Sequence, residues 1–105
     1  NINYNISQTI VVQTMSERKK ILFEKGDAFL ILPGGSGTIE EATEVISWKI
    51  LGLHNKPIII FNFQNYWQSL FDIYDNAKKL NFGNKNLQSI SININTLSEF
   101  KSFFN

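Results

Sequence analysis

The sequence contains no cysteine, and this absence excludes several chemistries at once. Without thiols, a chain has no disulfide framework, no thiol nucleophile and no thiolate metal site. No apolar run reaches the length that crosses a membrane. Neither sign of charge is in large excess, and a formal net charge of +1 favours neither nucleic acid nor a membrane surface as a partner. We therefore expect a cytoplasmic protein that binds no metal ion.

The most informative feature present is the glycine-rich run from Leu32 to Glu41. An apolar stretch, 28–32, precedes it and predicts a buried strand, and apolar residues at helical spacing follow it. These residues, which predict one face of a helix, are Ile39, Ala42, Ile46, Ile50 and Leu53. A strand that leads through such a turn into a helix is suited to bind an anion, because the helix N-terminus presents free amides and a positive dipole end. The run therefore predicts a site for a nucleotide phosphate.

Two better-known phosphate loops fit the run less well. The dinucleotide-binding fingerprint requires a third glycine, but Glu40 stands in its place. The nucleoside triphosphate loop requires Gly-Lys-Ser/Thr, and no lysine lies between Lys25 and Lys49. A tight strand-to-helix turn that uses glycine for its geometry alone remains the structural alternative.

Strands alternate with helices along the chain and predict an α/β fold with a parallel sheet flanked by helices. The predicted strands cover residues 8–13, 27–32, 58–61 and 90–94, and the predicted helices cover 17–25, 38–53, 67–80 and 97–104. On the third helix, Leu70, Phe71, Tyr74 and Ala77 form the predicted buried side. Ligands bind beyond the carboxyl ends of the strands in such sheets, and residues 34–38 fall at that position.

Two ordered motifs now support a family resemblance. A Met15-x-x-Arg18-Lys19 segment is followed at family spacing by Pro33-Gly-Gly-x-Gly-Thr-x-x-Glu41. Together they resemble the LONELY GUY family, the cytokinin riboside 5'-monophosphate phosphoribohydrolases, long mislabelled as lysine decarboxylases. The resemblance implies a Rossmann-like sheet, no cofactor, and hydrolysis of the N-glycosidic bond of an adenosine 5'-monophosphate whose base can carry an N6 substituent.

Family members are nearly twice as long as this chain, and their first half supplies a βαβ segment that nothing here matches. Residues 1–105 are therefore expected to be the C-terminal part of one nucleotide-binding domain. The family also implies a homodimer that contacts through the helix bearing Glu41.

The chemistry follows partly from the residues and partly from the resemblance. Cleavage of an N-glycosidic bond passes through an oxocarbenium-like state, which a nearby carboxylate stabilises. By resemblance Glu41 supplies this carboxylate and Arg18 is its catalytic companion. The implied substrate-binding residues are Arg18, Lys19, Gly34, Gly35, Ser36, Gly37, Thr38, Ile39, Glu40, Glu41 and Ser47. Ser47 stands where the family often has a threonine that contacts the nucleotide.

Simpler roles and other functions stand beside these predictions. Arg18 and Lys19 could form a solvated helix face, and Glu44 could face solvent or share the face of Glu41. His54 is expected at a helix end or an interface rather than in catalysis, and Trp67 is expected to pack. The alternative function is a nucleotide-binding module without turnover, while a decarboxylase is disfavoured because no pyridoxal phosphate lysine context is recognisable.

Overall fold

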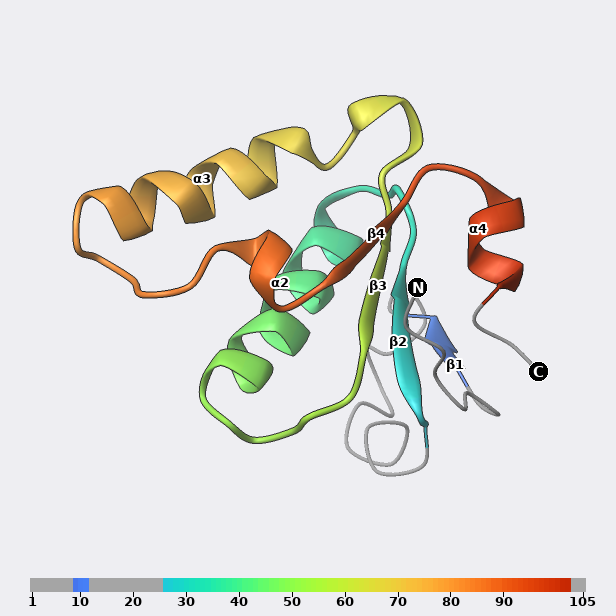
Figure 1. The fold of residues 1–105 in the computed structure, drawn as a ribbon, viewed down its shortest axis with the longest axis horizontal. Helices are drawn as coiled ribbons and strands as arrows, with labels where there is room; N and C mark the ends of the chain where they lie inside the picture. The colour runs from blue at the N-terminus through green and yellow to red at the C-terminus, as the bar shows by residue number, and fades with distance from the viewer. Residues whose placement is uncertain (1–8, 12–25, 103–105) are drawn as a thin grey trace.

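Four parallel strands form one sheet in the order β1-β2-β3-β4 in the computed structural model, which describes residues 9–11 and 26–102 (Figure 1). The strands are β1 (Thr9–Val11), β2 (Ala28–Ile31), β3 (Ile58–Phe61) and β4 (Ile92–Ile94). Their pairing is parallel throughout, with Phe29 of β2 opposite Ile58 of β3. The predicted α/β fold with a parallel sheet is confirmed. The predicted helix over 17–25 lies outside the described residues.

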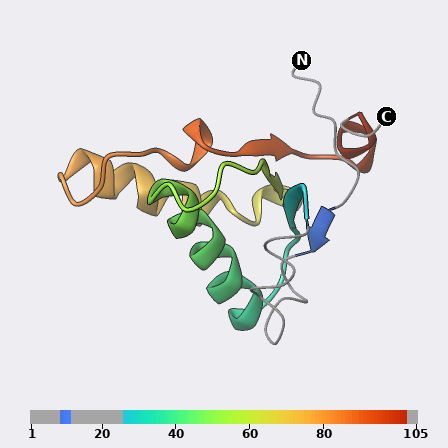
Figure 2. The same ribbon diagram turned by 90° about the horizontal axis from the view of Figure 1, so that it is seen from below.

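Helices cover both faces of this sheet (Figures 1 and 2). The main helices are α2 (Ser36–Ile50) and α3 (Gln68–Lys79), which lie on one side, and α4 (Leu97–Lys101), which lies on the other. Short 3-10 turns, η2 (Phe63–Asn65) and η3 (Leu87–Ser89), precede α3 and β4. Among the described residues, no helix combines the length and the apolar character needed to cross a membrane.

The two central strands are apolar on both faces because both faces are covered. All four residues of β2 are buried, as are the three isoleucines that begin β3. One face packs against α2 and α3, and its buried residues are Phe29, Ile31, Ala42, Val45, Ile46, Ile58, Ile60, Trp67, Phe71 and Leu87. The other face forms a smaller cluster of Ala28, Leu30, Ile59 and Ile94, against which Phe100 of α4 packs.

Helix α2 differs from the prediction at its ends. It ends at Ile50 because Gly52 adopts a left-handed conformation with φ of +78°. The amide of Gly52 then donates to Lys49 O and that of Leu53 donates to Trp48 O, which is the Schellman arrangement. Leu53 therefore lies outside the helix and is 62% exposed. Its predicted place on the apolar face of the helix was wrong.

The other predicted elements agree more closely with the structure. Helix α3 buries Phe71, and Leu70 and Tyr74 pack against the same core as predicted. Strand β4 begins at Ile92, later than predicted, because Ile90 is still the C-cap of η3. Helix α4 starts at a capping box, in which Thr96 and Glu99 each accept the other's backbone amide.

His54 lies just after α2, consistent with the predicted helix-end position, and joins the C-terminal half of this helix to the segment before β3. Its Nδ1 accepts a hydrogen bond from the amide of Lys56 at 3.0 Å, so its Nε2 carries the proton and donates to Val45 O at 3.0 Å. The ring centroid lies 5.1 Å from that of Phe29. Burial is the main cause that lowers the pKa of His54 below its ordinary value of 6.5, and the charges of Lys49 and Lys56 lower it further.

We expect the free energy of unfolding to fall as the pH decreases from about 7.5 to about 5.5. Because the pKa of His54 is lower in the folded state, the unfolded chain binds more protons below pH 6.5 and gains stability relative to the fold. Urea unfolding across this pH range measures the effect. His54 is the only histidine in the 105-residue sequence. A His54→Gln variant of this chain should therefore lose this pH dependence. An unchanged dependence of the free energy of unfolding on pH in the variant would contradict the assignment.

Candidate functional site

The glycine-rich run connects the carboxyl end of β2 to the N-terminus of α2, where the sequence placed it. The first helical hydrogen bond runs from the amide of Ile39 to Gly35 O, at 3.0 Å. The amides of Ser36, Gly37 and Thr38 therefore have no acceptor within the helix. Gly35 is the N-cap and brings no side chain to satisfy them. Three amides and the positive end of the helix dipole are thus available to an anion.

Glycine is required in this turn by a close approach at Gly34. A Cβ atom at Gly34 would lie 2.4 Å from Thr38 Oγ1 and 2.7 Å from Thr38 Cβ. Thr38 itself is buried beneath the turn. At Gly35 and Gly37, in contrast, a Cβ atom would meet no described atom within 4 Å. The exposed side of the turn is therefore open to a ligand.

Glu41 is a buried acid on the same helix. Its side chain is 5% exposed, although Glu40 beside it lies in solvent. Glu41 follows the first helical residue, Ser36, by about 7.5 Å along the helix axis. A carboxylate is costly to bury, so its position behind the free amides is consistent with a functional role. Glu44 is half-buried, so its exposure is intermediate between the two alternatives from the sequence, a place in solvent and a place on the face of Glu41.

The structure brings together only part of the predicted site. Residues 34–38 and Glu41 lie within the turn and the first two helical turns. Ser47 is exposed and lies about 16 Å from Ser36 along the helix axis, well away from the glycine turn. Arg18 and Lys19 lie outside the described residues.

Tyr66 was missed by the sequence analysis, and it contacts the glycine turn directly. Its hydroxyl donates a hydrogen bond to Gly34 O. The residue follows η2 at the carboxyl end of β3, next to the end of β2 in the sheet. The only local signal was an aromatic pair, Tyr66-Trp67, shortly after a predicted strand.

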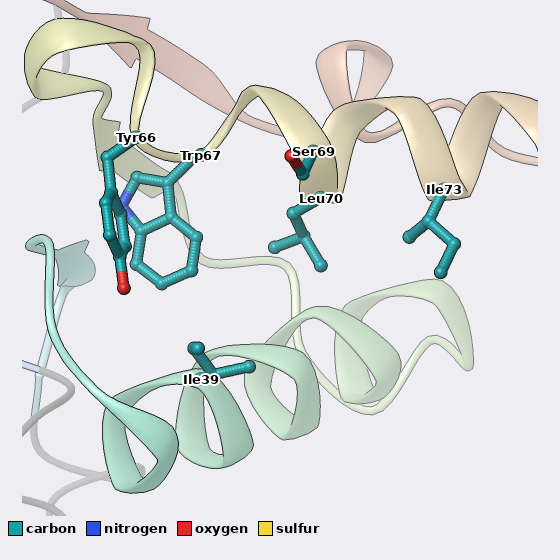
Figure 3. A pocket seen from close by; sticks show the side chains of 6 residues that line it. All are labelled: Ile39, Tyr66, Trp67, Ser69, Leu70 and Ile73. Atoms are coloured by element: carbon teal, nitrogen blue, oxygen red, sulfur yellow. The ribbon is translucent and has the colours of Figure 1, made fainter.

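An apolar cleft of about 370 Å³ adjoins the turn, between α2 and α3 (Figure 3). Its lining residues are Ile39, Tyr66, Trp67, Ser69, Leu70 and Ile73. Ile39, predicted on the apolar face of the helix, is 39% exposed and faces this cleft. Trp67 packs in the core as predicted and also closes one end of the cleft. The cleft and the free amides together can receive a ligand with an apolar part and an anionic part.

The described ranges 9–11 and 26–102 contain no group of three or more His, Cys, Asp or Glu residues that could hold a metal ion. In these ranges the site offers backbone amides, one buried carboxylate and an apolar wall.

A parallel sheet with a glycine-rich turn at its carboxyl edge defines a Rossmann-like α/β protein. Residues 2–102 match the family model described as possible lysine decarboxylase, and the chain belongs to this family. The resemblance to the LONELY GUY proteins is confirmed by curated relatives, all three below named as cytokinin riboside 5'-monophosphate phosphoribohydrolases.

The relatives share a substantial part of their sequence with this chain. The protein of Rhodococcoides fascians is 43% identical over 71% of this chain and 38% of its own length. A probable enzyme of Oryza sativa subsp. japonica is 42% identical over 73% of this chain and 34% of its own length. An Arabidopsis thaliana enzyme is 38% identical over 90% of this chain and 44% of its own length. The chain thus spans less than half the length of the relatives it matches.

We expect Gly34→Ala to destabilise the fold by about 1–3 kcal/mol, because the new methyl group would overlap Thr38. Gly35→Ala is the matched control. Gly35 has φ of −89° and ψ of −156°, an extended conformation that alanine adopts, and open space at its Cβ position. Urea unfolding of both variants measures the difference, and equal stability would show that Thr38 does not constrain the turn.

Proposed function

We propose that the protein hydrolyses the N-glycosidic bond of a nucleoside 5'-monophosphate and releases the free base and ribose 5-phosphate. The substrate we propose is an adenosine 5'-monophosphate whose base can carry an N6 substituent. The observation that carries the proposal is the buried carboxylate of Glu41 behind the free amides of the same helix. The family membership and the names of the relatives support it.

The geometry of α2 is compatible with this reaction. Amides of residues 35–38 would hold the 5'-phosphate, with help from the Ser36 hydroxyl. The ribose ring separates a 5'-phosphate from the anomeric carbon. The catalytic acid therefore has to lie about the length of one ribose from the phosphate. Glu41 stands back from the amides in this way, and Arg18 and Lys19 are proposed to complete the site.

The proposed chemistry places one negative charge where a positive charge develops. As the bond between the anomeric carbon and the base nitrogen breaks, its electron pair leaves with the base, which takes up a proton. The Glu41 carboxylate stabilises the oxocarbenium-like sugar, and water adds to the anomeric carbon and loses a proton. The apolar cleft beside Ile39 and Trp67 is suited to the flat face of the base.

Glu41→Gln should lower base release from AMP and from N6-isopentenyl AMP by about a hundredfold or more. The amide keeps the shape of the side chain and removes its charge. The assay uses the full-length protein, with Asp72→Asn on the exposed side of α3 as a control for loss of a carboxylate. Undiminished release by Glu41→Gln would contradict the assigned role. A parent protein that binds AMP without releasing base would instead establish the alternative, a nucleotide-binding module.

We also propose a homodimer in the cytoplasm, with the contact made along α2. Leu51 and Leu53, just beyond the C-terminal end of this helix, are 71% and 62% exposed, and large apolar side chains at such exposure favour an interface. Sedimentation of the full-length protein and of a Leu51→Ser/Leu53→Ser variant tests the contact, since the variant should be monomeric.

A further inference from the structure

The peptide unit between Gly34 and Gly35 has no side chain to fix its orientation. In a planar trans peptide, the carbonyl of Gly34 and the amide of Gly35 point in opposite directions. A flip of this unit would exchange the two, and it would change only ψ of one glycine and φ of the next. Since neither residue has a Cβ atom, little steric cost opposes such a flip. An anion at the turn would then meet an oxygen in place of an N–H group.

The Tyr66 hydroxyl holds this peptide unit in one orientation. It donates to Gly34 O across 32 residues of sequence. With the carbonyl of Gly34 engaged by Tyr66, the amide of Gly35 faces away from Tyr66. In this arrangement a side chain from the β3–α3 connection sets the direction of an amide in the β2–α2 connection.

Tyr66 is itself held in place by its neighbours. The backbone amide of Trp67 donates a hydrogen bond to Asn62 Oδ1 at 2.7 Å. Asn62 is buried, and its backbone amide donates to Ile94 O at 2.8 Å. The rings of Tyr66 and Trp67 meet edge to face at 5.1 Å, and the indole nitrogen lies on the side of Tyr66 (Figure 3). Trp67 is 3% exposed and belongs to the main core. The Tyr66 hydroxyl is therefore positioned by contacts that connect it to the core through Trp67.

We propose that Tyr66 is a positioning residue that sets the Gly34–Gly35 peptide so that the Gly35 amide joins those of Ser36, Gly37 and Thr38 in binding the 5'-phosphate. The inference rests on the proposed function, because it assigns the phosphate to this turn. It assigns to Tyr66 a contribution to the selectivity of the site for a nucleoside monophosphate over the nucleoside without phosphate.

Tyr66→Phe removes the hydroxyl and keeps the ring against Trp67. For the full-length protein, we expect the Kd of AMP to rise about three- to tenfold, the value of one hydrogen bond, with the Kd of adenosine unchanged. The control is Tyr74→Phe, which makes the same change at a half-buried tyrosine of α3 and should leave both Kd values unchanged. Isothermal titration calorimetry of both variants with AMP and with adenosine provides four Kd values, each compared with that of the unsubstituted protein.

A second measurement reads the peptide orientation without any ligand. The 15N and amide proton resonances of Gly35 should shift in Tyr66→Phe and remain in place in Tyr74→Phe. An unchanged Gly35 resonance, an unchanged Kd for AMP, or an equal loss of affinity for AMP and adenosine would each overturn the inference. If the unsubstituted protein binds no AMP, the proposed function fails first and the inference fails with it. This last outcome is recognised before any substitution is made.

Discussion

The parallel pairing of β2 with β3 is the constraint on which the rest of the structure depends. With Phe29 opposite Ile58 and Ile31 opposite Ile60, both strands end at the same edge of the sheet. The segments that follow the two strands, the glycine turn and the Asn62–Trp67 connection, are therefore neighbours in space although they lie far apart in the sequence. The free amides, the apolar cleft and the Tyr66 contact all follow from this adjacency.

Much of this arrangement could be predicted from the sequence because it depends on local patterns. The apolar runs of β2 and β3 predict buried strands, and the glycine-rich run predicts a helix N-terminus open to an anion. Helical periodicity also identified Ala42 and Ile46 as core residues. Periodicity shows which residues share a face, but not whether another element covers that face at each turn, so it did not reveal that Ile39 is 39% exposed at the cleft.

Contacts between distant segments could not be predicted in the same way. The bond from Tyr66 to Gly34 O depends on the strand register, on the positive φ values of Gln64 and Asn65, and on the amide of Trp67 finding Asn62. Local patterns in a single sequence do not predict these three features. Glu41, in contrast, could be identified from its motif, but its burial beside the amides required the packing of α2 on the sheet.

Helix α2 is attached to the sheet by different chemistry at its two ends. The turn at its N-terminus leaves no room for a Cβ atom between Gly34 and Thr38, and its Gly34 O accepts a hydrogen bond from the Tyr66 hydroxyl. Its C-terminal half is joined to the segment before β3 by the imidazole of His54, whose pKa is lowered by burial. Acidification below pH 6.5 therefore favours the unfolded chain, in which this imidazole accepts a proton more readily than in the fold. Resistance to unfolding thus depends on the medium through a residue at the opposite end of α2 from the glycine turn.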